Sequence, residues 1–578
     1  MQMNGARAVV ECLKAEAADT VFGYPGGTIM HVFDELYQDD GVRTILTRHE
    51  QGAAHAAEGF AKASDKAGVC ISTSGPGATN LTTGVANAML DSTPIIAISG
   101  QVATGSLGTD AFQEADLFGL MMPITKHNYK VMHSRDIPRV FKQAFHIATT
   151  GRPGPVHIDL PKDVQTGKLD FEYPKGVSIR GYRPHYEGHP MQIKQACVML
   201  VHAERPLIMA GGGVIISNAS QELTRLAEAL MAPVITTLMG KGAIDENHPL
   251  CLGMTGMHGR KSANWAVENC DVILAVGNRF DDRACGKFSE YAPQAKIIHV
   301  DIDSAEINKT VKCSLPIQGD AKNVLSQILA QLSAYSRKQN EWTARVAEMR
   351  QACECNYESC SQPLRHRAVI GELQKHLAGD TTVAVDVGLN QMWAAHHLRV
   401  AGPRRFLASG GLGTMGFALP AALGAKAASP QSQVVAFCGD GGFMMTNQEL
   451  ATSTEEALPF IATVMNNGWL GMVKQWQKIY MEGRHASVNL GKRTDFVKMA
   501  QSMGCEAMRA ETTAELAEGF AKAFSKKNRD TFVLDIIIDP EDGAFPMFLP
   551  GSAAKISNMF GECEFSELKS GAPIPLMA

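Results

Sequence analysis

The first candidate site in the sequence joins a Gly-Asp-Gly turn to a later asparagine. Residues 434–437 form a short apolar run that ends in Gly-Asp-Gly, and residues 460–465 form a second apolar run that ends in Asn-Asn. The pattern of residues 448–457 is helical, so the stretch predicts a strand, a helix and a second strand. A right-handed crossover brings the carboxyl ends of both strands to one edge of a parallel sheet. We therefore expect Asp440 and Asn467 to converge there.

Asp440 and Asn467 offer oxygen ligands to one small, hard cation. Mg²⁺ held by few protein oxygens usually completes its octahedron with the phosphates of a substrate or cofactor. The glycines beside Asp440 let the backbone approach such phosphates closely. A Gly-Asp-Gly alone is more often an ordinary turn, so the hypothesis depends on the helix, strand and Asn-Asn that follow. Together these features predict a magnesium and phosphate site.

Composition narrows the class of protein. The chain has 578 residues, enough for three or four domains, and its 45% hydrophobic and 20% charged residues are typical of a soluble globular protein. A net charge of -5 without a basic block argues against nucleic acid as the main partner. The N-terminal stretch has no apolar signal core, and the thirteen cysteines are an odd, scattered set typical of reduced thiols. We expect a cytoplasmic protein without a membrane span.

Residues 1–165 alternate apolar runs with helical stretches, and the runs end in Gly, Pro, Ser or His. This pattern predicts a doubly wound sheet with functional loops at its strand ends. Residues 44–47 form one such strand, and a helix rich in small residues follows, so Glu50 stands at a strand-to-helix junction. An acid favoured by the positive end of a helix is the alternative explanation for Glu50.

Two further α/β domains follow. A linker rich in Pro and Gly is predicted at 166–190, and the second domain at 191–335. In that domain a triple glycine follows one strand and Asp301 ends another, which suits a nucleotide, although a structural turn is an equal alternative. A connector at 336–365 leads to the third domain at 366–545, and 546–578 is predicted to be a C-terminal tail or lid. The first and third domains look like one architecture used twice.

The motifs RHEQGA, TSGPGATN, GTDAFQE, RFDDR, GLGTMGF and GMVKQW occur in one order along the chain. Together with Gly-Asp-Gly and Asn-Asn they resemble the acetohydroxyacid synthases, a family of thiamine diphosphate enzymes that also contain FAD. The resemblance spans all three domains. It implies an α/β fold with three doubly wound parallel-sheet domains of the thiamine diphosphate enzyme type.

The resemblance gives several residues a task at the cofactor. Glu50 would exchange a proton with the aminopyrimidine ring, Gly413 would offer its carbonyl to the pyrimidine amino group, and Met415 would bend the cofactor. Mg²⁺ would be held by Asp440, Asn467 and the backbone oxygen of Trp469. The remaining positions implied for thiamine diphosphate are Pro25, Gly26, Pro76, Asn80, Val387, Gly388, Leu389, Asn390, Gly439, Gly441 and Gly442.

The reaction implied is decarboxylation of pyruvate and transfer of the hydroxyethyl carbanion to a second 2-oxoacid. Pyruvate as acceptor gives 2-acetolactate and 2-oxobutyrate gives 2-aceto-2-hydroxybutyrate, the first common step of valine, leucine and isoleucine synthesis. Arg283 matches the residue that binds the acceptor carboxylate, and Trp476 the residue that prefers the larger 2-oxobutyrate. The other matching pocket positions are Phe112, Gln113, Lys162 and Met472.

The positions implied for FAD lie mainly in the second domain. They are Arg152, Gly211, Gly212, Gly213, Leu238, Met239, Gly256, Met257, His258, Gly277, Arg279, Asp281, Arg283, Asp301, Ile302, Glu306, Gly319 and Asp320. Because the pyrimidine side comes from the first domain and the diphosphate side from the third, the family builds its site between two subunits. A homodimer or a dimer of dimers is implied, and a separate small regulatory subunit is usual in the family.

Two positions depart from the family pattern. Leu389 replaces a polar residue that contacts the diphosphate in many relatives, and Gly442 replaces a common Ser, so we expect weaker cofactor affinity. The alternative functions are another thiamine diphosphate enzyme of 2-oxoacids, such as pyruvate oxidase or a carboligase, and a cofactor-binding scaffold without catalysis. The acid at Glu50 argues against glyoxylate carboligase, and the intact Asp440 and Asn467 argue against a scaffold.

Overall fold

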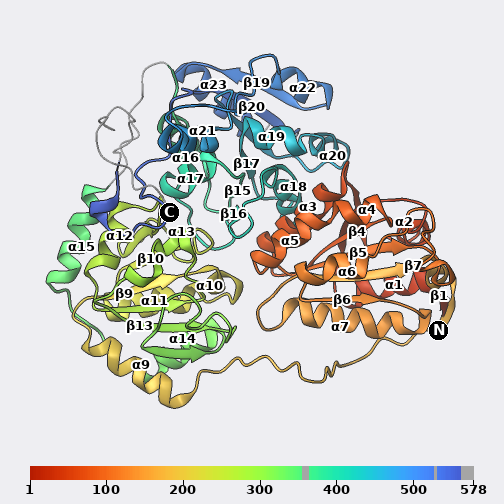
Figure 1. Cartoon of the computed structure of the whole chain (residues 1–578), viewed down its shortest axis with the longest axis horizontal. Coiled ribbons are helices and arrows are strands. Elements are labelled where there is room, and N and C mark those ends of the chain that lie inside the picture. Colours follow the sequence, from red (N-terminus) through yellow and green to blue (C-terminus); the bar gives the residue numbers. More distant parts are fainter. Residues whose placement is uncertain (354–362, 526–529, 561–578) are drawn as a thin grey trace.

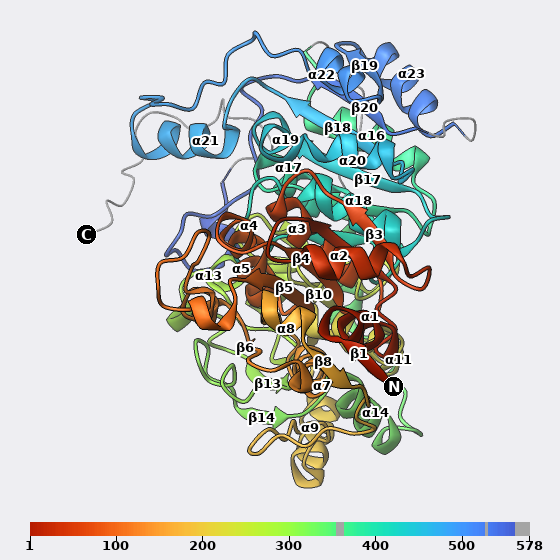
Figure 2. The same cartoon turned by 90° about the vertical axis from the view of Figure 1, so that its right-hand side faces the viewer.

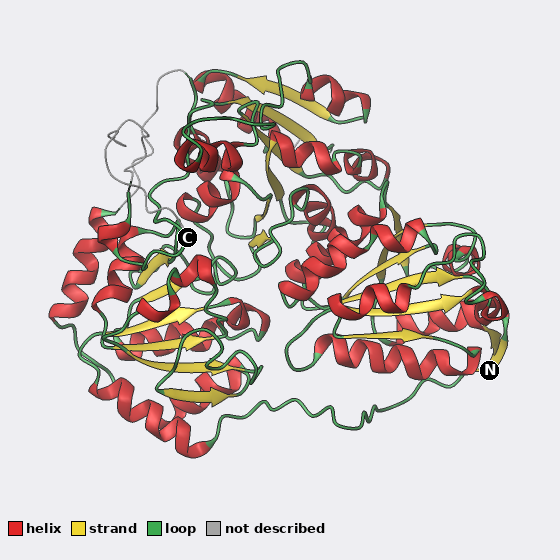
Figure 3. Cartoon of the chain, viewed as in Figure 1, coloured by secondary structure: helices red, strands yellow, loops and turns green. Residues whose placement is uncertain are grey.

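The chain folds into three lobes, each built around a six-stranded sheet with helices on both faces (Figures 1 and 3). The structure is a computed structural model, and it describes residues 1–353, 363–525 and 530–560. All neighbouring strands in the three sheets pair in parallel. The predicted fold class is confirmed.

The N-terminal domain has the strand order β3-β2-β4-β5-β7-β6. Its strands are β2 (Thr20–Tyr24), β3 (Arg43–Leu46), β4 (Gly68–Ser72), β5 (Ile95–Gln101), β6 (His127–Lys130) and β7 (Val156–Pro161). Its helices are α1 (Gly5–Ala15), α2 (Met30–Tyr37), α3 (Glu50–Ala63), α4 (Pro76–Asn80), α5 (Thr82–Leu90), α6 (Leu117–Met121), α7 (Ile137–Thr149) and α8 (Lys162–Thr166). Within the predicted linker, β8 (Lys168–Asp170) pairs antiparallel with β1 (Gln2–Asn4).

The middle domain has the strand order β11-β10-β9-β12-β13-β14. Its strands are β9 (Pro206–Ala210), β10 (Val234–Thr236), β11 (Cys251–Met254), β12 (Val272–Val276), β13 (Lys296–Asp301) and β14 (Leu315–Gln318). Its helices are α9 (Pro190–His202), α10 (Gly212–Ile216), α11 (Ser220–Leu230), α12 (Lys261–Asn269), α13 (Asp282–Cys285) and α14 (Ala321–Gln331). This is the order of dinucleotide-binding sheets, in which the ligand crevice opens where the winding reverses, between β9 and β12.

The C-terminal domain has the strand order β16-β15-β17-β18-β20-β19. Helix α15 (Glu341–Ala352) precedes it, and its strands are β15 (Thr382–Val385), β16 (Phe406–Ala408), β17 (Val434–Gly439), β18 (Ile461–Asn466), β19 (Glu506–Ala510) and β20 (Phe532–Ile537). Its helices are α16 (His366–His376), α17 (Leu389–His397), α18 (Ala418–Ala428), α19 (Asp440–Thr446), α20 (Glu449–Glu455), α21 (Gly471–Tyr480), α22 (Phe496–Ser502) and α23 (Thr513–Ala523). Counted from its own first strand, this order is that of the N-terminal domain, which confirms that one architecture is used twice.

The crossover between β17 and β18 differs from its prediction in one respect. The helix expected at 448–457 is α20, but a further helix, α19, precedes it and begins at Asp440 itself. The Gly-Asp-Gly is therefore a helix start and not a free turn. The N-terminal end of α19, with its partial positive charge, therefore lies at the carboxyl end of β17, where a phosphate site was expected.

Helices α3 and α18 join the N-terminal and C-terminal domains in one hydrophobic core. A Cβ at Gly59 of α3 would overlap the backbone of Ala421, and a Cβ at Gly424 of α18 would overlap the carbonyl oxygen of Ala56. The small residues that follow Glu50 thus allow the two helices to pack at backbone contact. This packing fixes α3, and with it Glu50, relative to the C-terminal domain.

The segment after β20 crosses from the C-terminal domain to the middle domain. Met547 and Phe548 are buried in the core of the middle domain, and the Phe548 N–H donates to the carbonyl oxygen of Met257 at 3.2 Å. The rest of the predicted tail, 561–578, lies outside the described residues. Across the described ranges, no helix is both long and apolar enough for a membrane crossing.

Candidate active site

The structure brings Asp440 and Asn467 to one corner of the C-terminal sheet, as predicted. Asp440 is only 3% exposed, and its Oδ2 accepts a hydrogen bond from the Gly468 N–H at 2.7 Å. Asn467 Oδ1 accepts from the Trp469 N–H at 2.9 Å. Gly468 has a φ of 72°, a left-handed conformation that favours glycine and lets the chain turn sharply between Asn467 and Trp469. Burial raises the pKa of Asp440 to about 6, a cost that a bound cation would offset.

The carboxyl ends of β15 and β17 lie side by side, at the point where the winding of the C-terminal sheet reverses. Asn390 in the first turn of α17 donates to the carbonyl oxygens of Asp386 at 2.6 Å and Phe437 at 3.3 Å. Its Oδ1 lies 3.0 Å from the position that a Cβ would take at Gly439. The segment 387–390 therefore lies opposite Gly439, at the place where open α/β sheets bind ligands.

Asp386 organises the loop that carries Gly413 and Met415. Its buried carboxylate accepts hydrogen bonds from the N–H groups of Gly416 at 2.9 Å and Ala418 at 3.0 Å. Met415 Cε lies 3.3 Å from the Cβ position of Gly441, beside Asp440. Sequence reasoning missed Asp386, although an acid at the end of an apolar strand is a visible signal.

The two departures from the family pattern have local structural reasons. A Cβ at Gly442 would overlap Asp386 Oδ1, so a side chain at this position needs Asp386 to move. Leu389 is 5% exposed, and its Cδ1 lies 2.5 Å from the Cβ position of Gly471. As the first residue of α17, it packs against α21 in the hydrophobic core. The expected weakening of cofactor affinity stays a prediction.

Glu50 begins α3 and lies at the strand-end edge of the N-terminal domain. It is 9% exposed, its Oε2 accepts from the Asn80 side-chain amide at 3.0 Å, and its Oε1 lies 3.2 Å from the Cβ position of Gly77. Gln113 has a φ of 63° and packs on Gly75. Pro76 begins α4 and Lys162 begins α8. Gly26, which follows Pro25, packs on Thr73.

A cavity of about 510 Å³ between the middle and C-terminal domains gathers the other predicted pocket residues. Arg283 lines it from α13, Met472 and Trp476 from α21, and Val387 and Gly413 from strand-end segments. Figure 2 shows α21 projecting to one side of the C-terminal domain. No residue of the N-terminal domain lines this cavity, so one chain does not bring Glu50 or Phe112 into it.

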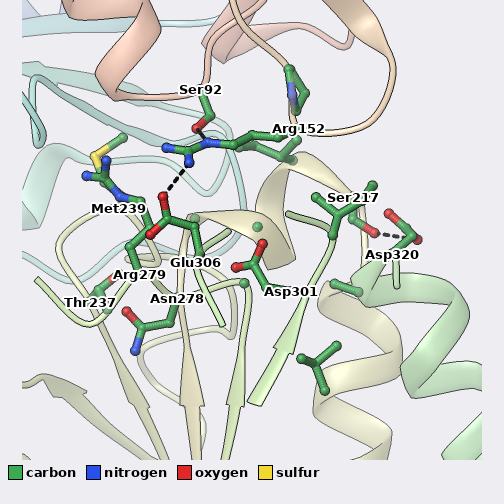
Figure 4. A pocket seen from close by; sticks show the side chains of 18 of the residues that line it. Ser92, Arg152, Ser217, Thr237, Met239, Asn278, Arg279, Asp301, Glu306 and Asp320 are labelled. Atoms are coloured by element: carbon green, nitrogen blue, oxygen red, sulfur yellow. Dashed lines mark hydrogen bonds and ion pairs between the residues drawn. The ribbon is translucent and has the colours of Figure 1, made fainter. Parts of the chain in front are cut away.

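A second cavity, of about 110 Å³, opens at the reversal point of the middle sheet (Figure 4). One of the cations that line it is Arg152 from the N-terminal domain, which donates to Glu306 Oε1 at 2.7 Å and to Ser92 Oγ at 2.9 Å. Burial raises the pKa of Asp301 on its floor to about 6. The further predicted FAD positions that line it are Gly212, Gly213, Met239, Gly277, Arg279, Asp281, Ile302, Gly319 and Asp320.

The two cavities suit the two ends of one elongated ligand. Met239, Arg279 and Asp281 line both of them, while Leu238, Met257 and His258 line only the larger. Gly211 and Gly213 pack against the backbone of Gly277, so a Cβ at either position would collide with it. Gly256, with a φ of 107°, packs on Arg283.

His258, which lines the larger cavity, has a ring nitrogen without a partner in the described part of the chain. Its Nε2 is buried without a hydrogen-bond partner among the described residues, and burial lowers its pKa to about 4. The chain's own residues therefore fit a flavin dinucleotide.

Asp91 is a further residue that sequence reasoning missed. It leaves the end of α5 and accepts hydrogen bonds from the N–H groups of Gly410 at 3.2 Å and Gly411 at 2.7 Å. Its Oδ2 also accepts from Lys62 at 2.7 Å. The N-terminal domain thereby holds the start of the loop that carries Gly413. Because the groups that Asp91 binds in this loop are backbone N–H groups, no residue pattern predicts this role.

Three family models match the chain. The N-terminal TPP binding domain of thiamine pyrophosphate enzymes matches residues 3–120, the central domain matches 193–328, and the C-terminal TPP binding domain matches 386–536. Together with the three parallel sheets and the convergence of Asp440 and Asn467, these matches show that the chain is a thiamine pyrophosphate enzyme.

Relatives narrow this class. The chain is 52% identical to the probable acetolactate synthase large subunit of Methanocaldococcus jannaschii, over 95% of this chain and 94% of that one. It is 46% identical to the acetolactate synthase large subunit of Corynebacterium glutamicum, over 96% and 89%. It is 43% identical to the acetolactate synthase isozyme 3 large subunit of Escherichia coli, over 95% and 97%. The chain belongs to the acetolactate synthase large-subunit family, which confirms the predicted family over pyruvate oxidase or a carboligase.

Proposed function

We propose that this chain is the catalytic subunit of an acetolactate synthase that joins two 2-oxoacids after decarboxylating the first, pyruvate. The observation that carries the proposal is the convergence of Asp440, Asn467, Met415 and Gly413 at one sheet edge, beside a cavity that holds Arg283 and Trp476. Thiamine diphosphate, when bound, supplies the carbon nucleophile that attacks pyruvate and stabilises the negative charge left by loss of CO₂.

Asp440, Asn467 and the Trp469 carbonyl would hold Mg²⁺ against the diphosphate. Carboxylate, amide and carbonyl oxygens are the hard ligands that this cation prefers. The N–H groups in the first turn of α19 and the segment 387–390 would take the remaining phosphate oxygens. The chain's contribution here is to bind and orient, with no proton moved.

Glu50 would hold a proton at one carboxylate oxygen and pass it to and from the pyrimidine ring nitrogen. Asn80 fixes the orientation of that carboxylate from the other side. Gly413 has a φ of 72°, and no atom lies within 4 Å of the position that a Cβ would take there. In this proposal its carbonyl faces the pyrimidine amino group. Met415 would keep the cofactor bent between these groups.

The active unit in this proposal is a homodimer with its sites between subunits. The cavity with Arg283 and Trp476 lacks any residue of its own N-terminal domain, and Glu50 of a second copy would complete it. Apolar side chains around both halves are exposed to solvent, as an uncovered interface requires: Phe112, Met122, Leu412, Met445 and Leu490. Phe112, 88% exposed, and Gln113 would enter the partner's pocket with Lys162.

Arg283 and Trp476 would select the acceptor. The guanidinium can bind the carboxylate of the second 2-oxoacid through two parallel hydrogen bonds. Trp476, stacked on Tyr480 at 5.5 Å between ring centroids, offers an apolar face for the extra methylene of 2-oxobutyrate. Covering this cavity with a partner excludes water, which would otherwise protonate the reacting carbon and release acetaldehyde.

FAD in this proposal is mainly structural, since joining two oxoacids causes no net redox change. Arg152 ties the N-terminal domain to the flavin cavity, so the cofactor would hold two domains in register. Because the relatives are named large subunits, we also propose a separate small subunit as partner of this chain.

The test is product analysis by the purified chain with pyruvate, 2-oxobutyrate, thiamine diphosphate, Mg²⁺ and FAD. The proposal predicts acetolactate and acetohydroxybutyrate, with the latter in excess at equal substrate concentrations. Acetaldehyde or peroxide as the main product would contradict it. Removing FAD should lower activity through loss of assembly, which a parallel measurement of molecular mass detects.

A further inference from the structure

A carboxylate of the C-terminal domain lies against the start of α3, the helix that begins with Glu50. Glu449, the first residue of α20, is fully buried, and its Oε1 accepts hydrogen bonds from the backbone N–H groups of Arg48 and His49, each at 3.1 Å. Its Oε2 accepts from the same Arg48 N–H at 3.2 Å and from the Thr452 hydroxyl at 2.7 Å. The side chain therefore binds the two residues that immediately precede Glu50.

The first turn of α3 is shaped to receive this carboxylate. A Cβ at Gly52 would overlap Glu449 Oε1, so the glycine of the RHEQGA motif leaves the space that the carboxylate fills. The start of a helix carries unpaired N–H groups and partial positive charge, which a carboxylate stabilises. His49 caps the same turn by accepting from the Gln51 N–H at 3.1 Å. Glu449 is thus part of the structure that sets the direction of α3.

The connection between β17 and β18 carries both Asp440, the proposed metal ligand, and Glu449. Asp440 begins α19 and Glu449 begins α20, and both helices lie between β17 and β18. Figures 1 and 2 show α20 of the C-terminal domain near α3 of the N-terminal domain. A displacement of α20 therefore moves the backbone of His49, and with it the first residue of α3.

We propose that Glu449 is a positioning residue that fixes the backbone before Glu50 and so aims the Glu50 carboxylate at the cofactor. This inference rests on the proposed function, in which Glu50 exchanges a proton with the pyrimidine ring. Glu449 does not touch the reacting atoms. It acts through the backbone N–H groups of Arg48 and His49. The carboxylate of Glu50 itself is held by the side-chain amide of Asn80.

A double-mutant cycle between positions 449 and 50 tests the proposal. Glu449→Ala in the holoenzyme is expected to lower kcat by about 100-fold with little change in the KM for pyruvate, since small misplacements of catalytic groups have effects of this size. The same substitution in a Glu50→Gln background is expected to change the residual kcat by less than about twofold, because the group it positions is already lost. Equal losses in both backgrounds would overturn the proposal.

Thiamine diphosphate binding, measured by quenching of tryptophan fluorescence, reads the same cycle without turnover. Glu449→Ala is expected to raise the dissociation constant only where Glu50 is present. This binding measurement separates the positioning role of Glu449 from the proposed function, because it can be made even if the chain forms no acetolactate. An equal rise in both backgrounds would reduce Glu449 to a general structural role.

Two matched variants control for folding. Glu449→Gln keeps a carbonyl oxygen for the N–H groups of Arg48 and His49, so it should restore at least half of wild-type kcat. Glu456 also crosses between the domains, accepting from the Leu46 N–H at 3.1 Å, but it does not contact the residues next to Glu50. Glu456→Ala should leave kcat within about twofold. Failure of the Gln variant to restore kcat, or a large loss with Glu456→Ala, would contradict the proposal.

Discussion

The carboxylate of Asp440 accepts a hydrogen bond from the Gly468 N–H at 2.7 Å, across the ends of two neighbouring parallel strands. This contact pins the Asn467–Trp469 segment to the first turn of α19. The three residues proposed as magnesium ligands, Asp440, Asn467 and Trp469, are thereby held close together by the folded chain itself.

Asp440→Asn is expected to weaken Mg²⁺-dependent binding of thiamine diphosphate at least about tenfold, or about 1.4 kcal/mol. The amide keeps one oxygen but loses the charge that attracts the cation. Isothermal titration at fixed Mg²⁺ measures this. Asp535→Asn, at a buried acid of β20, the strand on the far side of β18, is the control, and an equal effect of both variants would contradict the role of Asp440.

Gly442→Ser is expected to destabilise the chain by about 1–3 kcal/mol, the usual cost of overpacking a core. The added Cβ would collide with Asp386, which holds the loop of Gly413 and Met415. Urea unfolding measures the change. Gly402→Ser is the control because a Cβ there meets no atom within 4 Å. Unchanged stability of Gly442→Ser would show that Asp386 can yield at no cost.

Leu389→Gln tests the second departure. Because Leu389 is packed against Gly471, we expect a loss of about 1–3 kcal/mol from burying an amide that lacks partners. If a missing polar contact weakens the cofactor in this chain, the same variant should lower the thiamine diphosphate dissociation constant. An unchanged constant would exclude that explanation and leave Leu389 a packing residue.

Trp476→Ala is expected to reduce the preference for 2-oxobutyrate over pyruvate by about tenfold or more, since one methylene in an apolar pocket is worth about 1–3 kcal/mol. The measurement is the ratio of the two products from mixed substrates. Tyr480→Ala removes the ring stacked behind Trp476 and should change the ratio less. An unaltered ratio in Trp476→Ala would place acceptor selection elsewhere.

Asp159, a carboxyl buried within the N-terminal sheet, should make a contribution to stability that falls as pH rises. Burial raises its pKa from 3.8 to about 7, with Ser99 and Gln101 donating to it at 3.2 Å each. The folded state thus binds a proton that the unfolded state has lost between about pH 4 and pH 7. Stability contributed by this group is full below pH 4 and is lost through pH 7, at most about 1.4 kcal/mol per pH unit.

Asp159→Asn should remove this contribution, so the slope of stability against pH, measured by urea unfolding, should differ from that of the wild-type chain between pH 4 and pH 7. His157 lies beside Asp159, and burial lowers its pKa from 6.5 to about 3, so it contributes a slope of the opposite sign that both chains share. Lys130 and Asp116 act on Asp159 through their charges and in opposite directions. Equal slopes in the variant and the wild type would show that Asp159 is not a source of the pH dependence.

The sequence predicted those parts of the site that depend on local patterns. Asp440 and Asn467 each follow an apolar run that ends in turn residues, and parallel strands must bring such ends together. Glu50 is placed by the same rule, since a strand and a helix of small residues flank it. The three doubly wound sheets follow from the alternation of runs and helical stretches.

The parts that sequence reasoning missed are acids whose partners are backbone groups. Asp386 binds N–H groups about 30 positions away, and Glu449 binds the N–H of His49 at a separation of 400. Every residue type except proline offers such a donor, so no residue pattern marks the partner. The additional helix α19 was missed for a related reason, because glycine-rich segments favour turns and only tertiary packing makes this one helical.

Subunit complementation tests the central claim most directly. Glu50→Gln damages only the N-terminal half of a site and Asp440→Asn only the C-terminal half, so a mixed dimer would hold one intact site. After exchange of equal amounts of the two inactive variants, acetolactate formation from pyruvate should recover to on the order of a quarter of the wild-type rate, as statistical pairing in a two-fold dimer requires. No recovery in a mixture shown by mass measurement to contain mixed dimers would contradict the account.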